Sequence, residues 1–155
     1  MKIFFVAFIE LIALYIAKRD RLIAKIFFLI WLIVIVYIVF LNRSKFDSPQ
    51  IIVVPFRSMR LFFRYFSSNP KIGLDYVEGA ILNIMLFIPF GYLISILFSN
   101  IDHWWKAVLC GILISLIIEI AQLLSCVGVF DFEDIINNTL GTIVGWCCTI
   151  GLKNE

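Results

Sequence analysis

The sequence predicts an all-α, polytopic helical membrane protein with about five transmembrane helices and one interfacial amphipathic segment. Of the 155 residues, 63% are apolar and only 15% are charged, whereas soluble domains carry about 25% charged residues. So few polar groups could not cover the surface of a soluble fold, but lipid tails solvate an apolar surface. A spanning helix needs about 20 largely apolar residues, so the chain has room for four or five spans and for no separate soluble domain.

The first two apolar runs are expected to cross the membrane. Residues 3–17 form the first run, and a basic sequence without a small-residue cleavage site follows it, which argues against a signal peptide. Residues 22–41 form the second and clearest run. We therefore divide the chain into an N-terminal transmembrane helix with a basic cytoplasmic loop, residues 1–25, and a larger transmembrane domain, residues 26–155.

Residues 42–79 have a different character, because basic and aromatic residues alternate there between prolines. Basic side chains recur at helical spacing at Arg57, Arg60 and Arg64. Apolar side chains occupy another face of the same helix at Phe56, Met59 and Phe63. This pattern is typical of an interfacial helix that lies in the headgroup zone.

Three further spans are expected at residues 80–98, 107–129 and 135–152. Lys and Arg in short loops indicate orientation, and the loop at 18–25 holds four basic residues, which places it in the cytoplasm. Residues 42–79 and 126–134 then lie outside, and the 99–106 loop and the C-terminus lie inside. The arginines of 42–79 oppose this assignment, but the rule is weaker in a longer, partly interfacial segment.

Polar side chains within the expected spans need a partner or a function, because inserting a charged residue costs about 2.5–3.5 kcal/mol. One helical stripe that must face other helices contains Ser115, Glu119, Gln122 and Cys126. A second face contains Asp131, Asp134 and Asn138 if a helix begins near Asp131. The predicted topology brings both faces to the outer side of the membrane. The resulting candidate pocket consists of Arg43, Arg57, Asn83, Glu119, Gln122, Asp131, Asp134 and Asn138.

The alternative interpretation is a packed polar core without a ligand. In that case an arginine pairs with an acid, the amides satisfy backbone groups and Asp134 caps a helix. Gly141 and Gly145 form a small-xxx-small pair, which predicts close approach of another helix. The four cysteines lack metal-ligand spacing, so neither a metal site nor a resident cofactor is predicted.

Several motifs follow one another along the chain. They are Asn83-Ile-Met-Leu-Phe-Ile-Pro-Phe-Gly91, Glu119-x-x-Gln122, Gly128-Val-Phe-Asp131-x-x-Asp134, Asn138-Thr-Leu-Gly141, Pro55-Phe56-Arg57 and Arg43. Together they resemble the signatures of the VanZ-like family. The resemblance covers about residue 26 to the C-terminus. Many members carry an arginine where this chain has Val129-Phe130, so any role of that arginine is either absent here or taken over by Arg43 or Arg57. The resemblance implies a multi-pass protein of the bacterial cytoplasmic membrane, and the founding member is associated with resistance to the lipoglycopeptide teicoplanin.

Three functions are compatible with these residues. The preferred hypothesis is a non-enzymatic protein that affects the cell envelope and glycopeptide resistance, with an outer-face pocket for a lipid headgroup, the drug or a cell-wall precursor. The second is an enzyme acting on a lipid-linked phosphate, in which Glu119, Asp131 and Asp134 hold Mg²⁺. The third is a structural accessory subunit. No nucleophile with an adjacent base is evident, enzymatic activity and oligomeric state stay open, and no nucleic-acid partner is expected.

Overall fold

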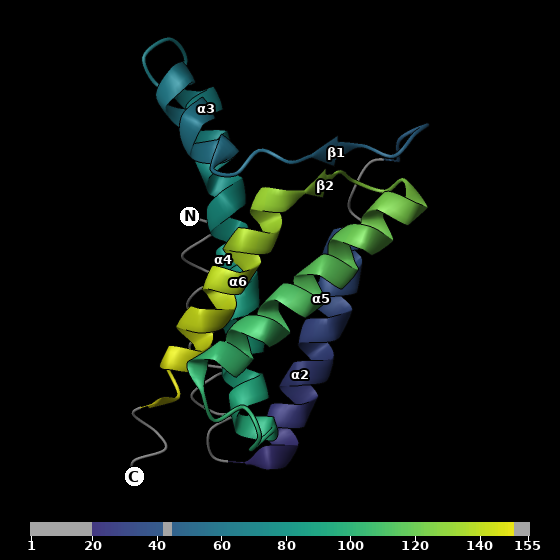
Figure 1. The fold of residues 1–155 in the computed structure, drawn as a ribbon, viewed down its shortest axis with the longest axis vertical. Coiled ribbons are helices and arrows are strands. Elements are labelled where there is room, and N and C mark those ends of the chain that lie inside the picture. The colour runs from purple at the N-terminus through teal and green to yellow at the C-terminus, as the bar shows by residue number, and fades with distance from the viewer. Residues whose placement is uncertain (1–19, 42–44, 151–155) are drawn as a thin grey trace.

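The computed structural model describes residues 20–41 and 45–150. The helices are α2 (Arg21–Val36), α3 (Arg57–Tyr65), α4 (Pro70–Leu97), α5 (Trp104–Ser125) and α6 (Phe132–Cys147), and α2 continues as the π-helical turn η1 (Tyr37–Leu41) (Figure 1). Two short strands, β1 (Ile51–Ile52) and β2 (Phe130–Asp131), pair in parallel. The mostly helical fold confirms the helical part of the prediction, and this small strand pair is an addition to it.

Three helices in the described part of the chain are long and apolar enough to cross a membrane: α2 with η1, α4 and α5. They correspond to the runs expected at 22–41, 80–98 and 107–129. The span expected at 135–152 is instead α6, a 16-residue helix that is too short to count with the other three. The span expected at 3–17 lies outside the described residues.

The longest helix, α4, begins well before the apolar run that predicted it. Pro70 occupies its first turn, and the side chain of Asn69 accepts a hydrogen bond from the Ile72 backbone N–H. Proline is favoured in a first helical turn because its missing N–H would have no partner there. Charged residues between positions 70 and 79 interrupt the apolar run, so hydrophobicity alone predicts a later start.

Helix α6 packs closely against α4 through glycines. A Cβ atom on Gly141 would collide with the backbone oxygen of Ile84, and one on Gly145 would collide with that of Ile88. The contact is reciprocal, because a Cβ on Gly91 of α4 would meet the backbone of Thr142. The structure thus confirms that the small-xxx-small pair permits close helix approach.

Aromatic side chains join α2 to α4. The ring centroid of Trp31 lies 4.9 Å from that of Phe90 and 5.6 Å from that of Phe87. All three side chains are buried. The Trp31 indole N–H also donates to the Leu86 backbone oxygen at 2.7 Å, three residues before Pro89. The indole therefore finds the hydrogen-bond partner that a buried tryptophan needs.

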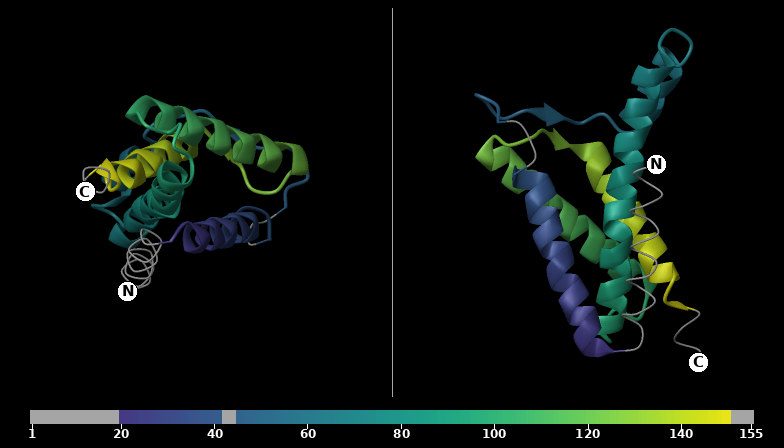
Figure 2. Two further views of the ribbon diagram at one scale, coloured as in Figure 1. Left: turned by 90° about the horizontal axis from the view of Figure 1, so that it is seen from below. Right: turned by 180° about the vertical axis from the view of Figure 1, so that it is seen from behind.

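The connections between helices gather at the two ends of the molecule. The start of α2, the α4–α5 connection and the end of α6 lie together at one end, and α3, β1 and β2 lie at the other (Figures 1 and 2). This arrangement agrees with the predicted grouping of the loops, while the side of the membrane that each end faces stays a prediction. In the α4–α5 connection, hydrogen bonds from Lys106 and His103 hold the pKa of the Asp102 carboxyl well below its usual range.

Helix α3 forms at the predicted arginines but does not lie flat across the end of the bundle. It packs alongside the first turns of α4, so that the two helices form a hairpin that extends beyond β1 and β2 (Figures 1 and 2). A Cβ on Gly73 of α4 would lie 3.2 Å from the Phe62 backbone oxygen, and the rings of Tyr65 and Tyr76 stack with centroids 6.3 Å apart. These contacts fix α3 along α4, which the helical spacing of its arginines could not predict.

Candidate functional site

Asp131 links three segments at the start of α6. Its Oδ1 accepts a hydrogen bond from the Glu133 backbone N–H at 2.9 Å, which caps the helix. Its Oδ2 lies 3.1 Å from Nη1 of Arg57, and its own backbone N–H donates to Oε2 of Glu119 at 2.8 Å. Three predicted site residues therefore meet here, although they are distant in sequence.

The paired strands explain why Arg57 reaches Asp131 across 74 positions. Ile51 aligns with Phe130 and Ile52 with Asp131 in the parallel pair. The Phe130 N–H donates to the Gln50 oxygen at 2.9 Å. The chain that leads into α3 is thereby fastened to the chain that leads into α6, and both helices begin at the same place.

Glu133 and Ser58 form a contact that the sequence analysis missed. Oε2 of Glu133 accepts from the Ser58 backbone N–H at 2.9 Å and from the Ser58 hydroxyl at 3.1 Å, and the Glu133 side chain is buried. Residue Phe56, at the N-cap of α3, has left-handed backbone (φ 54°) and provides no side-chain cap. A carboxylate of α6 thus supplies the cap that α3 lacks, at the end of the helix where the dipole favours negative charge. The one available signal was the absence of a capping residue before Arg57.

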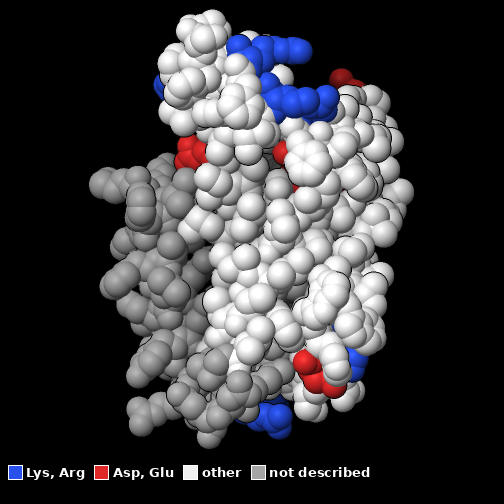
Figure 3. Space-filling model, turned by 60° about the vertical axis from the view of Figure 1, so that its left-hand side comes forward, with Lys and Arg blue, Asp and Glu red and all other residues white. Residues whose placement is uncertain are grey.

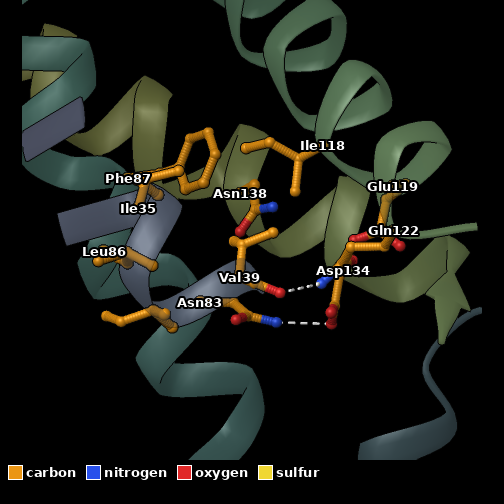
Figure 4. Close-up of a pocket in the computed structure, with 11 residues that line it drawn as sticks. Ile35, Val39, Asn83, Leu86, Phe87, Ile118, Glu119, Gln122, Asp134 and Asn138 are labelled. Atoms are coloured by element: carbon orange, nitrogen blue, oxygen red, sulfur yellow. Dashed lines mark hydrogen bonds between the residues drawn. The ribbon is translucent and has the colours of Figure 1, made fainter. Parts of the chain in front are cut away.

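A small cavity lies beside this cluster, between α2 with η1, α4, α5 and α6 (Figure 4). Its volume is about 20 Å³, roughly the space for one water molecule or one small polar group. Its polar lining comes from Asn83, Glu119, Gln122, Asp134 and Asn138. Its apolar lining comes from Ile35, Ile38, Val39, Leu86, Phe87 and Ile118. Five of the eight predicted pocket residues therefore converge on one space.

Hydrogen bonds hold most of these polar groups in place. Nδ2 of Asn83 donates to Oδ1 of Asp134 at 2.5 Å, and Nε2 of Gln122 donates to the Val39 backbone oxygen at 3.4 Å. Both bonds are visible in Figure 4. Asn138 donates through Nδ2 to the Ser115 hydroxyl at 2.8 Å. The amide donors are thus engaged by the protein itself.

Two amide oxygens of the lining residues are not satisfied in this way. Oε1 of Gln122 and Oδ1 of Asn138 are buried and have no hydrogen-bond partner within the described part of the chain. A buried acceptor without a partner costs about 1–3 kcal/mol, so such groups in a native fold call for a reason. A hydroxyl or ammonium group inside the cavity could donate to these oxygens.

The remaining predicted residues take different positions. Arg57 and Asp131 do not line the cavity, and Asp131 is linked to it through the hydrogen bond from its backbone N–H to Glu119. Arg43 lies outside the described residues. The predicted stripe on α5 is buried at Ser115, Glu119 and Gln122, whereas Cys126 ends the helix in left-handed backbone (φ 54°). No group of three His, Cys, Asp or Glu residues able to hold a metal ion occurs among the described residues.

Comparison with known proteins identifies relatives of the chain. A family model described as VanZ/LLP1 matches residues 22–153. Protein VanZ of Enterococcus faecium is 37% identical over 73 residues, which make up 47% of this chain and 44% of that protein. The match thus spans less than half the length of that relative. No solved structure matches the chain significantly.

Proposed function

The chain belongs to the VanZ/LLP1 family, and from this premise we propose that it is a non-enzymatic protein of the bacterial cytoplasmic membrane that alters the cell envelope. In this proposal, the cavity beside α6 binds a polar group of a lipid headgroup or of a glycopeptide such as teicoplanin at the outer face. Resistance to such a drug would then follow from changed engagement of the drug with the envelope.

The observation that carries the proposal is the pair of buried amide oxygens of Gln122 and Asn138. A ligand ammonium group has enough N–H donors for both oxygens, and a ligand hydroxyl could donate to one of them; either would reduce the free-energy penalty of leaving these acceptors without a partner. The proposal therefore specifies a hydrogen-bond donor rather than a phosphate as the group inside the cavity.

The size of the cavity defines how a larger ligand would bind. About 20 Å³ accepts one small polar group, and neither a headgroup nor a glycopeptide fits inside as a whole. Asn83 and Asp134 are half-buried, whereas the other polar lining residues are buried, so these two form the more exposed part of the polar lining. The remainder of the ligand would lie against these two residues, outside the cavity.

The proposal is tested by the substitution Gln122→Met, which removes the amide oxygen at nearly constant side-chain volume. It also removes the hydrogen bond to the Val39 backbone oxygen. Because this bond is long, at 3.4 Å, and therefore weak, we expect its loss to change the stability little. The matched control is Asn137→Leu, because Asn137 is likewise a buried amide with an unpartnered atom in the described chain but does not line the cavity.

Both variants are expressed to equal abundance in a glycopeptide-susceptible bacterium, and teicoplanin susceptibility is measured. Binding of teicoplanin and of phospholipids with hydroxyl or ammonium headgroups is titrated on the purified proteins by native mass spectrometry. Wild type and Asn137→Leu should lower susceptibility and bind one of these ligands, and Gln122→Met should bind about 10-fold more weakly, as expected for about 1.4 kcal/mol. Equal binding by Gln122→Met and wild type would refute the proposed site.

A further inference from the structure

Helix α3 has three faces, and one of them packs within the protein. Its inner face meets α4 through Phe62 and Tyr65. A second face carries the exposed guanidinium groups of Arg60 and Arg64. The third face is apolar, and its side chains are exposed at Met59 (52%), Phe63 (70%) and Phe66 (48%).

The apolar face of α3 is not covered by any other described part of the chain. Phe56 (63% exposed) extends it toward the bundle. Contiguous exposed apolar patches mark contacts with a membrane, a ligand or a partner. Arg60 and Arg64 form no ion pair with the described residues, and Arg60 donates only to the Pro55 backbone oxygen at 3.2 Å. A ligand for this surface should therefore have both apolar groups and a negative charge.

The length of α4 places this surface at headgroup depth. Its 28 residues extend for about 42 Å at 1.5 Å per residue, whereas a bilayer measures about 30 Å across its hydrocarbon core and about 40–45 Å with its headgroups. The start of α5 lies at the opposite end of the molecule, and its first two residues, Trp104 and Trp105, are exposed and mark the other interface. The first turns of α4, and α3 beside them, then fall in the headgroup layer.

The distribution of charge agrees with this placement. On the face seen in Figure 3, basic side chains gather at one end of the molecule with acidic side chains close to them, and a broad uncharged belt separates this end from the charged groups at the other end. An apolar surface in such a belt is solvated by lipid tails. A guanidinium group forms paired hydrogen bonds with phosphate oxygens.

We propose that α3 is a binding element for anionic phospholipids, in which Met59, Phe63 and Phe66 enter the leaflet surface while Arg60 and Arg64 hold lipid phosphates. This surface is separate from the cavity beside α6 and does not depend on the function proposed for it. The hairpin with α4 presents the aromatic and basic faces side by side, as an amphipathic helix at a membrane interface does.

The charge requirement is tested with the full chain in nanodiscs of phosphatidylcholine and phosphatidylglycerol. Retention of phosphatidylglycerol is measured by native mass spectrometry for wild type and for Arg60→Gln/Arg64→Gln. The matched control is Arg21→Gln/Lys25→Gln, which removes two exposed positive charges at the opposite end of the molecule. We expect the α3 variant to lose about 10- to 30-fold in affinity for phosphatidylglycerol and the control to lose clearly less. Equal losses in the two variants would overturn the assignment of lipid phosphates to α3.

The insertion of the apolar face is tested separately by fluorine NMR in the same nanodiscs. Trifluoromethyl-phenylalanine is placed at position 63, at Leu113 in the exposed middle of α5 as the lipid reference, and at Asn100 in the exposed α4–α5 connection as the water reference. Broadening by a doxyl-labelled lipid should be strong at 63 and 113, and broadening by a soluble gadolinium chelate should be strong at 100. Strong gadolinium broadening at 63, or protection from both agents together with cross-linking between copies, would overturn the proposal.

Discussion

Replacing Glu133 by Gln should loosen α3 while leaving the membrane helices intact. The Glu133 carboxylate accepts two hydrogen bonds from Ser58. Hydrogen bonds to charged groups contribute about 1.5–3 kcal/mol, compared with about 0.5–1.5 kcal/mol for neutral ones. A negative charge at a helix N-terminus adds about 0.3–1 kcal/mol. Because Gln retains one acceptor oxygen, we expect α3 to lose roughly 1–2 kcal/mol of local stability.

The measurement is hydrogen exchange of the reconstituted protein, followed by mass spectrometry of peptides from α3 and α5. A local loss of this size increases the open population of α3, and thus its exchange rate, by about 5- to 30-fold. The control is Glu78→Gln, which neutralises an exposed carboxylate on α4 near the same end and should leave the exchange of α3 unchanged.

Two results would refute the cross-helix cap. Unchanged exchange of α3 in Glu133→Gln would show that the carboxylate does not stabilise this helix. Equal acceleration in α3 and α5 would show that the substitution destabilises the whole bundle, so that Glu133 acts as a core residue. The substitution Glu133→Ala provides a graded check, because it removes both acceptor oxygens and should accelerate α3 more than Gln does.

Two further predictions concern packing and the ion pair beside the cavity. Gly145→Ala should lower the unfolding free energy by about 1–3 kcal/mol, because its Cβ would collide with the Ile88 oxygen. The control is Gly79→Ala, whose Cβ meets nothing within 4 Å and which should be neutral or stabilising by up to about 1 kcal/mol. Denaturant titration of both variants in one detergent measures the difference. A double-mutant cycle of Arg57→Gln and Asp131→Asn should give a coupling free energy of about 0.5–1 kcal/mol for this partly exposed pair. A coupling indistinguishable from zero would show that the ion pair does not stabilise the site.

Much of the bundle was predictable because apolar runs and helical spacing are local properties of the sequence. Runs of apolar residues predicted α2, α4 and α5, and the spacing of Glu119 and Gln122 predicted one buried face. The glycine pair predicted close approach of another helix to α6, and the structure identifies that helix as α4. Each of these predictions follows from the pitch of a single helix and from the need to satisfy its polar residues away from lipid.

The parts that could not be predicted depend on contacts between distant segments. The bond between Glu133 and Ser58 joins residues 75 positions apart, and it exists because two short strands align the chains before α3 and α6. Two-residue strands leave no recognisable alternation in a sequence. The early start of α4 and the placement of α3 beside it likewise follow from packing between helices.

The polar residues at the end of the molecule that holds α3 and the start of α6 form two groups, those that cap helices and those that keep an acceptor without a partner in the described chain. Asp131 and Glu133 cap the starts of α6 and α3, where free backbone N–H groups need acceptors, so their substitution should disturb the fold itself. Gln122 and Asn138 instead keep amide oxygens without a partner in the described chain, so their loss should affect a ligand more than the fold. If the proposed function is correct, variants of Asp131 and Glu133 show faster hydrogen exchange in α6 and α3 even without a ligand. Variants of Gln122 and Asn138 lose ligand binding in a protein that remains folded.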